Sequence, residues 1–527
     1  MRKIIILSFL MISSIVFSKT IDVTDLGAIN NGVFSNTKII NEGIRNLAKE
    51  GGGTLYFPSG VYLTGPIVLK SNITIHVEAG ATIKFSDDFA EYTPFVEMRY
   101  EGVVMKSFMP LFYAYEQENI TIKGEGLIDG NGKKWWYGTF VLEGAHKEDL
   151  LEKEVRKYQK MWDKENPNFF IEESSDWKRT LNKKYFRPPL FQTYKCKGVT
   201  VSDLTFINSP FWTINPEFCE NVRIQGVTIN NPDAPNTDGV NPSSCKNVII
   251  SNCNINVGDD CITLKSGRDL QGREFGIPCE NITITNCIMM AGHGGVVIGS
   301  EMSGDVRRVT ISNCIFDGTD RGIRLKSARG RGGIVEELRI NNIVMNNIKK
   351  EAITLNLFYS DIKEEEFSER TPIFRNIHVS NLTGTNVSTA CSILGIEESF
   401  IQNLSFSNIN LAAQTGFIID KAKDVLLKDI KISVSEGTPF VLSNSKKIHI
   451  NNISSPSYSV SNPLIKVFDV ENMFIQSCFP FNECKAFLEL DGSLTNNIIL
   501  KGNFLGNLQR PLLKGNNLRS DLLLVED

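Results

Sequence analysis

The chain has little of several features that mark large classes of proteins. Histidine is scarce, at 5 of 527 residues, and the His-Glu-x-x-His motif of helical zinc sites does not occur. The 56 lysines and arginines are balanced by 60 acidic residues, so no strong basic field indicates binding to nucleic acid. Beyond the N-terminus, no apolar run is long enough to cross a bilayer. The composition therefore argues against a nucleic-acid-binding protein and against an integral membrane protein.

The one long apolar run lies at the N-terminus. Met1-Arg2-Lys3 is followed by apolar residues from Ile4 to Phe17 and then by Ser18, a pattern typical of a secretory signal peptide. We expect residues 1–18 to be removed after Ser18, with a retained N-terminal anchor as the alternative. The mature protein is then expected to be secreted or periplasmic, with no membrane attachment after cleavage.

The cysteine count is odd, and the chain is large for a disulfide scaffold. Most of the 11 cysteines, from Cys196 to Cys314, recur at equivalent positions of a sequence repeat. This recurrence predicts thiols stacked in a core. Cys478 and Cys484, which lie close together in the sequence, are the best candidates for a disulfide bridge.

A short repeat runs through most of the chain. Its variants include Cys219-Glu-Asn-Val-Arg-Ile-Gln-Gly, Cys245-Lys-Asn-Val-Ile-Ile-Ser-Asn and Cys279-Glu-Asn-Ile-Thr-Ile-Thr-Asn. The period is irregular, roughly 20 to 35 residues, with apolar residues alternating inside each strand-like segment. Such units bury their apolar face only by stacking, which predicts an all-β fold, a right-handed parallel β-helix. The recurring asparagines suit turns with left-handed backbone and can stack their amides between coils.

Two segments depart from the repeat. Residues 36–50 have a helical apolar face formed by Ile39, Ile40, Ile44 and Leu47, and we expect this helix to cap the stack of strands. Residues 139–185 are charged and partly helical in pattern, which predicts an insertion on the outside of the solenoid. The expected organisation is a cap and first coils at 19–115, then a β-helix catalytic domain at 116–527 that carries the insertion. The insertion is either a solvated decoration or a wall at one end of a groove.

Acidic residues crowd together at Asp238 and in Gly258-Asp259-Asp260. Further polar residues follow at intervals of about one coil, and such spacing brings side chains onto one face of a solenoid. These residues are His293, Arg324, Lys326 and Tyr359. Gly258 is suited to a bulge that lets both neighbouring aspartates reach one cleft. An ordinary polar turn and a solvated pair of cations are the structural alternatives.

Crowded carboxylates shift one another's pKa, so that one is protonated while another stays ionised. A glycosidase needs this pair of states, one to protonate the leaving oxygen and the other to activate water or attack carbon. Arginine and lysine on the same face would bind an anionic substrate. The residues therefore predict a glycosidase that cleaves a chain of acidic sugars.

The ordered motifs Asn-Thr-Asp at 236–238, Gly-Asp-Asp at 258–260, Gly-His-Gly at 292–294 and Arg-Leu-Lys at 324–326, with the later Tyr359, resemble those of glycoside hydrolase family 28, the polygalacturonases. The resemblance begins at Gly-Gly-Gly-Thr-Leu-Tyr-Phe-Pro-Ser-Gly, 51–60. The family motif has isoleucine where this chain has Leu325, a conservative departure that should face the core.

The resemblance implies inverting hydrolysis of α-1,4-galacturonosidic bonds without a metal or other cofactor. It assigns Asp259 as the general acid, supported by His293, and Asp238 and Asp260 as the pair that holds and deprotonates water. The remaining residues would bind galacturonate at the cleavage point: Arg324, Lys326 and Tyr359.

Segments after Asp260 resemble the bacterial exo-acting branch of the family. They are Ser266-Gly-Arg-Asp-Leu-Gln-Gly-Arg, Gly299-Ser-Glu-Met-Ser-Gly and Arg329-Gly-Arg-Gly-Gly. We therefore expect attack from chain ends on an acidic polysaccharide or oligogalacturonide. The sequence does not determine the oligomeric state, and a monomer is the expectation. The alternatives are endo action, hydrolysis of rhamnogalacturonan or xylogalacturonan, a calcium-dependent pectate lyase, and a non-catalytic β-helix that binds carbohydrate.

Overall fold

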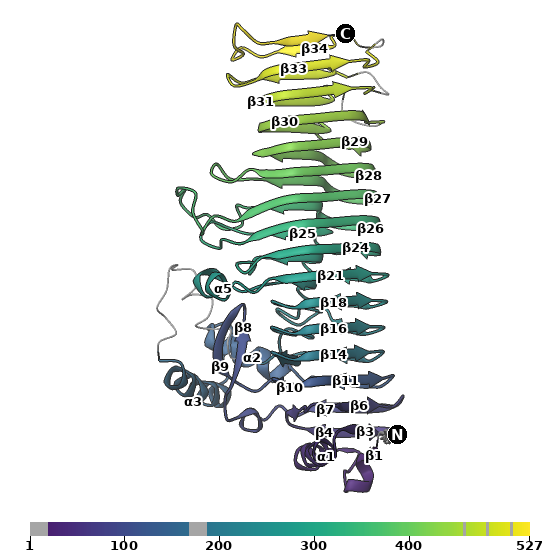
Figure 1. Cartoon of the computed structure of the whole chain (residues 1–527), viewed down its shortest axis with the longest axis vertical. Coiled ribbons are helices and arrows are strands. Elements are labelled where there is room, and N and C mark those ends of the chain that lie inside the picture. The colour runs from purple at the N-terminus through teal and green to yellow at the C-terminus, as the bar shows by residue number, and fades with distance from the viewer. Residues whose placement is uncertain are drawn as a thin grey trace, which may run out of the picture.

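The computed structural model describes residues 19–167, 187–456, 460–480, 484–505, 508 and 510–526. The expected signal peptide lies outside the described residues, as does the second part of the insertion from residue 168 onward. Figure 1 shows a long column of stacked coils with a group of helices on one side near its N-terminal half. The predicted right-handed parallel β-helix is confirmed, since 30 strands form one continuous sheet wound around a single core.

Three parallel ladders run along the column. The first takes one strand from nearly every coil: β1 (Thr20–Asp22), β3 (Gly53–Phe57), β6 (Ile73–Val77), β11 (Glu118–Gly124), β14 (Lys197–Ser202), β16 (Glu220–Gln225), β18 (Lys246–Ser251), β21 (Cys279–Thr285), β24 (Val306–Asp317), β26 (Ile334–Asn356), β27 (Ile373–Leu394), β28 (Ile401–Asp420), β29 (Ala422–Val434), β30 (Phe440–Ser454), β31 (Ile465–Gln476), β33 (Asn496–Lys501) and β35 (Leu524–Glu526).

The second ladder merges with the first at β24, because the later strands are long enough to turn the corner between two faces. It contains β2 (Asn31–Ser35), β4 (Gly60–Thr64), β7 (Ala81–Phe85), β12 (Leu127–Asp129), β15 (Thr205–Ile207), β17 (Thr228–Asn231), β19 (Asn254–Val257) and β22 (Ile288–Ala291).

The third ladder carries the candidate site. It begins with β5 (Ile67–Val68), β10 (Phe112–Tyr115) and β13 (Phe191–Tyr194), then continues through single bridges at Ile214 and Val240. Beyond them it contains β20 (Asp260–Leu264), β23 (Gly294–Gly299) and β25 (Ile323–Lys326), then the ends of β26, β27 and β28, part of β30 and of β31, β32 (Leu488–Asp491) and β34 (Leu512–Lys514).

The strands follow from the alternation of the repeat. In β16, Val222 and Ile224 are buried while Asn221 and Arg223 between them are exposed. Burial of a valine or isoleucine side chain stabilises the fold by about 1.5–3 kcal/mol. Neighbouring coils repeat this pattern in register, as in the pairs Val222–Val248 and Ile224–Ile250, so their apolar side chains form one continuous core.

Asparagines mark the corners of the coils, as the sequence predicts. Asn221, Asn247 and Asn281 all have left-handed backbone, with φ between 58° and 59°. The Asn247 amide donates to the Asn221 side-chain oxygen at 3.0 Å, and the Asn281 amide donates to that of Asn247 at 2.9 Å. Asparagine tolerates this conformation better than other side chains, and the amide ladder links one coil to the next.

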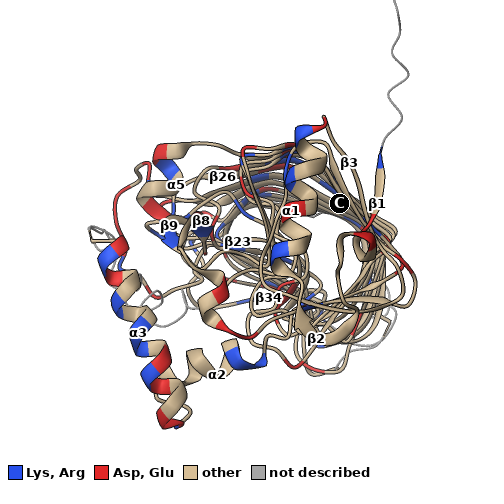
Figure 2. Cartoon of the chain, turned by 90° about the horizontal axis from the view of Figure 1, so that it is seen from below, with Lys and Arg blue, Asp and Glu red and all other residues tan. Residues whose placement is uncertain are grey.

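Helix α1 (Thr37–Lys49) covers the N-terminal end of the core, where the sequence predicts a capping helix. It buries Ile40, Ile44 and Leu47 against the first strands, and Figure 2 shows it lying across this end of the column. Among the described residues, no helix is both long and apolar enough to cross a membrane.

A group of elements lies beside the third ladder (Figure 1). It contains the 3-10 helix η2 (Phe89–Tyr92), the antiparallel hairpin of β8 (Val96–Tyr100) and β9 (Val103–Ser107), and the helices α2 (Lys133–Leu142), α3 (Asp149–Glu165) and α5 (Asp269–Phe275). The other 3-10 helix, η1 (Val23–Leu26), precedes β2. Helix α3 lies within the predicted helical insertion, whereas the hairpin is not foreseen from the sequence.

The cysteines are structural. The repeated positions from Cys196 to Cys314 are buried as free thiols in the core, as predicted. The predicted bridge between Cys478 and Cys484 is wrong: Cys478 is a buried free thiol whose sulfur donates to the carbonyl oxygen of Gln476 at 3.1 Å. The Cys484 sulfur donates instead to the carbonyl oxygen of Ala486.

Candidate active site

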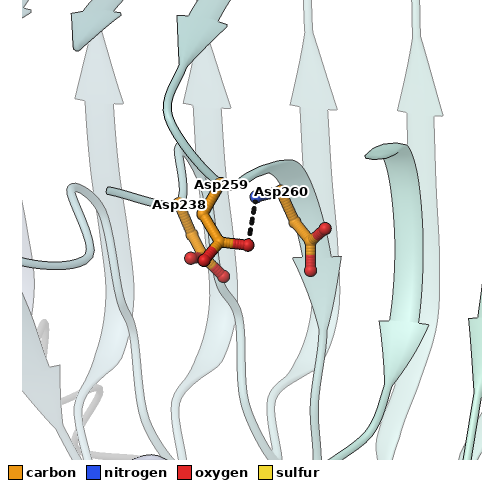
Figure 3. A group of neighbouring side chains, drawn as sticks. All are labelled: Asp238, Asp259 and Asp260. Atoms are coloured by element: carbon orange, nitrogen blue, oxygen red, sulfur yellow. Dashed lines mark hydrogen bonds between the residues drawn. The ribbon is translucent and has the colours of Figure 1, made fainter. Parts of the chain in front are cut away.

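Three aspartates from two consecutive coils meet in one cleft. Figure 3 shows Asp238, Asp259 and Asp260 pointing to the same side, and one oxygen of each lies within 4.8 Å of the other two. The cleft has a volume of about 530 Å³ and opens beside the third ladder. The structure thus brings together the three acidic residues that the sequence singles out.

Glycines allow the chain to pass this closely. A side chain on Gly258 would come within 2.2 Å of the Ala234 carbonyl oxygen, so close approach explains this glycine. Gly292 has a φ of 86°, and a side chain there would lie 2.5 Å from the carbonyl oxygen of Asp259. The carboxylates of Asp259 and Asp260 both reach the cleft because β20 begins only at Asp260, directly after the turn.

Asp259 accepts three hydrogen bonds. The backbone N–H of Asp260 donates to Oδ1 at 3.0 Å, and the Asn236 amide donates to Oδ2 at 3.1 Å. His293 Nδ1 lies 3.0 Å from Oδ1 and comes from the glycine-rich turn before β23. The Asp259 side chain is 16% exposed and that of His293 is 53% exposed, so both are accessible from the cleft.

Asp260 is paired with the two predicted cations. Lys326 Nζ lies 2.8 Å from Oδ2, and Arg324 Nη1 lies 3.4 Å from Oδ1. Both cations lie on β25, and Leu325 between them faces the core, as predicted. The Tyr359 ring, 5.6 Å from each cation, covers them from the loop after β26. All seven predicted site residues therefore line one cleft.

Asp238 is more deeply buried than Asp259. Its Oδ2 accepts from the Asn241 amide at 2.9 Å and lies 4.0 Å from Lys265 Nζ. Lys265 pairs more closely with Glu301, at 2.9 Å, and lies over the Trp212 ring. Lys265, Glu301 and Trp212 also line the cleft, and the sequence analysis does not single them out. From the sequence, a single lysine within a repeat is expected to be exposed to solvent. The burial of Lys265 in the cleft depends on contacts between coils, which the sequence does not show.

The surroundings shift the pKa values of Asp238 and Asp259 in opposite directions. Burial, reinforced by the charge of Asp259, raises the pKa of Asp238 well above its usual range, although Lys265 opposes the shift. Burial also acts to raise the pKa of Asp259, but the His293 hydrogen bond and the charge of Lys326 outweigh it and lower that pKa. The hydrogen bond to Asp259 in turn raises the pKa of His293. The pKa shifts of Asp238 and Asp259 are thus opposite in direction, and the lowered pKa of Asp259 works against the protonated state that the resemblance assigns to it.

The hairpin β8–β9 closes one side of the cleft. Its turn residue Glu101 lines the cleft and lies 3.6 Å from Arg268, whose backbone N–H donates to the carbonyl oxygen of Gly102 at 3.2 Å. None of the described residues of the predicted insertion lines the cleft; helix α3 and Asn166 instead brace the hairpin. The Lys106 N–H donates to the Asn166 side chain at 2.9 Å.

The three aspartates are close enough together to hold a cation, but protein cations already compensate them. Asp260 contacts Arg324 and Lys326, and Asp238 lies beside Lys265. A metal ion would have to enter against these three positive charges. The donor set therefore suits acid–base chemistry better than metal binding.

The other histidines lie outside the cleft, as expected of structural residues. His76 packs against Tyr56, His378 contacts Ser405 at 2.6 Å, and His449 stacks on Phe474. His146 lies against Tyr137 in the group of side elements.

Two family models and several known proteins match this chain. The model of "Glycosyl hydrolases family 28" matches residues 170–415, and that of "Rhamnogalacturonase A/epimerase, pectate lyase-like" matches residues 20–141. The crystal structure of a hyperthermoactive exopolygalacturonase from Thermotoga maritima is 34% identical, with a TM-score of 0.65 over 82% of this chain and 92% of that one.

Two sequence relatives extend the likeness. A probable polygalacturonase from Vitis vinifera is 28% identical over 73% of each chain, and an exo-poly-alpha-D-galacturonosidase from Dickeya chrysanthemi is 26% identical over 79% of this chain and 71% of its own. The family model covers every residue of the aspartate cluster and its cations. This chain is therefore a glycoside hydrolase that belongs to family 28.

Proposed function

We propose that the protein hydrolyses α-1,4-galacturonosidic bonds of polygalacturonate, the acidic backbone of pectin. The observation that carries the proposal is the cluster of three carboxylates within 4.8 Å beside Arg324 and Lys326. The carboxylates supply acid and base, and the cations match the charge of a uronate. The names of the Thermotoga and Dickeya relatives support the same substrate.

Substrate binding would raise the pKa of Asp259, so that this general acid takes up a proton from solvent. Lys326 lowers the pKa of Asp259 in the protein by itself. A galacturonate carboxylate that pairs with Lys326 and Arg324 offsets their charge and adds a negative one, which raises the pKa of Asp259. Asp259 then holds a proton for the leaving oxygen, and the protonated His293 ring stabilises the carboxylate that remains.

Asp238 and Asp260 would hold the attacking water between them. A cation accompanies each of them, since Lys326 Nζ lies 2.8 Å from Asp260 Oδ2 and Lys265 Nζ lies 4.0 Å from Asp238 Oδ2. The two carboxylates lie on neighbouring coils, so one water molecule can donate a hydrogen bond to each. The water proton passes to this pair as the oxygen attacks the anomeric carbon.

We propose that the reaction inverts the anomeric centre, as the family resemblance implies. The separation of catalytic carboxyls is typically about 6.5–9.5 Å in inverting and about 5–5.5 Å in retaining glycosidases. One oxygen of each aspartate lies within 4.8 Å of the other two, so a retaining route through a glycosyl ester on Asp238 or Asp260 is the competing mechanism. Proton NMR of the first products separates the two, because inversion of an α-linkage yields the β-anomer and retention yields the α-anomer.

We propose attack at chain ends because the hairpin β8–β9 bounds one side of the cleft and would limit how far a polymer chain can extend through it. Glu101 at its turn lines the cleft, and its pairing with Arg268 leaves a bounded pocket on that side. Products from polygalacturonate should be mono- or digalacturonate from the earliest times. A rapid fall in viscosity with mixed oligomers would instead show endo action.

A pectate lyase is the competing activity from another class. It would need calcium held by carboxylates, and the aspartate cluster is the one group of described residues spaced for a cation. A lyase leaves unsaturated ends that absorb ultraviolet light and stops in chelator. We expect saturated reducing ends and full activity in chelator.

We further propose that the mature protein acts as a secreted or periplasmic monomer. A polymer such as pectin is met outside the cytoplasm, and residues 1–18 have the pattern of a signal peptide. N-terminal sequencing of exported protein should begin at Lys19, and gel filtration should give the mass of one chain. An N-terminus at Met1 would contradict the cleavage.

A further inference from the structure

A buried arginine outside the cleft is left unused by this mechanism. Arg187 lies just before β13, is 1% exposed and does not line the cleft. Among the described residues, no carboxylate lies within 4 Å of its guanidinium. Burial of a charge is costly, and it lowers the pKa of Arg187, although nearby charges, among them those of Glu101 and Asp259, oppose the shift. The cost of burying the Arg187 guanidinium must therefore be offset by the hydrogen bonds that it makes.

The guanidinium binds the loop that carries the Asn-Thr-Asp motif. Nη1 donates to the carbonyl oxygen of Pro235 in a short hydrogen bond and to that of Pro210 at 3.4 Å. Nη2 donates to Asn236 Oδ1 at 2.7 Å. The Phe211 ring lies 5.0 Å from the guanidinium carbon, on one face of it. Arg187 thus donates hydrogen bonds both to the backbone just before Asn236 and to the Asn236 side chain.

This contact decides which way the Asn236 amide points. An amide has an oxygen that accepts and a nitrogen that donates, whereas a guanidinium can only donate. The atom that meets Arg187 must therefore be Oδ1. The nitrogen Nδ2 is then directed to Asp259 Oδ2, 3.1 Å away. With Arg187 present, the amide cannot turn over and present its oxygen to the carboxylate.

We infer that Arg187 is a positioning residue, which locks the Asn236 amide as a donor to Asp259 and so fixes the orientation of that carboxyl group. Asp259 is held on Oδ1 by the Asp260 N–H and by His293, and on Oδ2 by Asn236. Without the donor from Asn236, the carboxyl group of Asp259 can rotate about its Cβ–Cγ bond. Its proton is then no longer directed at the leaving oxygen. The inference rests on the proposed role of Asp259.

The charged groups that act on Asp259 are the cations His293, Lys326, Lys265 and Arg187, and the neighbouring carboxylates of Asp238 and Asp260. Arg187→Lys keeps the positive charge at 187, and Asn236→Ala changes no charge. A hydrogen bond to the ionised form lowers a carboxyl pKa, so loss of the Asn236 donor raises it. A general acid works below its pKa, so the basic limb of the pH profile then moves to higher pH.

The test is a double-mutant cycle of Arg187→Lys and Asn236→Ala, with kcat measured on polygalacturonate across pH. We expect each single variant to lose about tenfold in kcat, the effect of one hydrogen bond, and to move the basic limb upward. Because both changes break one chain of contacts, the double variant should lose little more than either single variant. The inference would be overturned if the loss of kcat in the double variant equalled the product of the two single losses. It would also be overturned if neither single variant moved the basic limb of the pH profile.

Arg99→Lys is the matched control, since Arg99 is an equally buried guanidinium bonded to Glu217 and Ser244. Arg99→Lys should lower the stability of the protein without moving the basic limb of the kcat profile. If it moves that limb as far as Arg187→Lys does, the shift is a general effect of altering a buried arginine, and the inference is refuted. Crystal structures of the variants need no substrate, so they separate this inference from the proposed activity. In Arg187→Lys the Asn236 nitrogen should leave Asp259, and an unmoved Asn236 would refute the lock even if the protein had another substrate.

Discussion

At the scale of single residues, the site depends on how differently three identical side chains are surrounded. Asp260 contacts two cations, Asp259 accepts three hydrogen bonds, and Asp238 is buried beside Lys265. Like charges this close cannot all ionise freely, and the surroundings decide which one holds a proton. The sequence predicts the crowding, but the individual states depend on partners from other coils.

Lys265 sets the ionisation of Asp238, which gives a prediction about pH. Asp238 must be ionised to accept a proton from water, so activity rises as pH passes upward through its pKa. Lys265 lowers that pKa, and Lys265→Met removes the effect. The acidic limb of the kcat profile should therefore move to higher pH. Lys246→Met, which removes a half-exposed lysine paired with Glu280 on the outer face, should leave the limb unchanged; equal shifts in both variants would refute this role for Lys265.

At the scale of elements, the asparagine corners are a stabilising device that can be tested singly. Asn247→Ala puts alanine at a φ of 58° and breaks the amide ladder on both sides. Left-handed backbone costs a residue with a Cβ atom roughly 1–2 kcal/mol, so we expect a free energy of unfolding lower by about that amount. Asn247→Gly accepts the backbone and loses only the ladder, and it should be less damaging. Chemical denaturation of both variants measures the difference, and an alanine variant as stable as wild type would refute the argument.

The hairpin β8–β9 gives a prediction about the mode of attack. Replacing residues 98–105 with a two-residue Asn-Gly turn removes Glu101 from the cleft and opens its end. Viscosity of a polygalacturonate solution should then fall faster for each bond cleaved, because internal bonds gain access. Leu150→Ser, at an exposed position on α3, should leave this ratio unchanged. A shortened hairpin that still released only terminal products would show that other elements impose exo action.

The elements also show where sequence reasoning reaches its limit. Strands such as β3, β6 and β16 are foreseen because burial on one face requires alternation, and α1 because Ile40, Ile44 and Leu47 share a face. Residues 96–107 alternate in the same way, so the sequence does not distinguish an antiparallel hairpin from another coil. The partner of a strand is a tertiary property. For the same reason Lys265 and Arg187 escape notice, since their contacts join distant segments.

At the scale of the whole molecule, the solenoid explains the cysteines. Thiols stacked in the core of a parallel coil need no bridges, because each coil is held by its neighbours on both sides. We therefore expect a thiol reagent to titrate 11 cysteines in denatured protein without reductant, and almost none in native protein. If only nine thiols reacted in the denatured protein, two cysteines would be joined in a disulfide, and the bridge between Cys478 and Cys484 would have to be reconsidered.

The solenoid also explains how residues from Asn236 to Tyr359 form one cleft. Each coil adds one or two polar side chains to the same face, so the spacing in the sequence becomes proximity in space. The motif order therefore predicts which side chains meet at this cleft. It does not predict the hairpin beside the cleft, the buried pair of Lys265 and Glu301, or the opposite pKa shifts of Asp238 and Asp259.

The most direct test of the proposed chemistry is the rate of reducing-end release from polygalacturonate by wild type and by Asp259→Asn. Asparagine keeps the shape of the side chain but cannot donate an acidic proton, so kcat should fall by about 10²–10⁴-fold. Asp424→Asn, at an exposed aspartate near Lys447 on a distant coil, should retain the wild-type rate. An Asp259→Asn variant with full activity would contradict the assignment of Asp259 as the general acid.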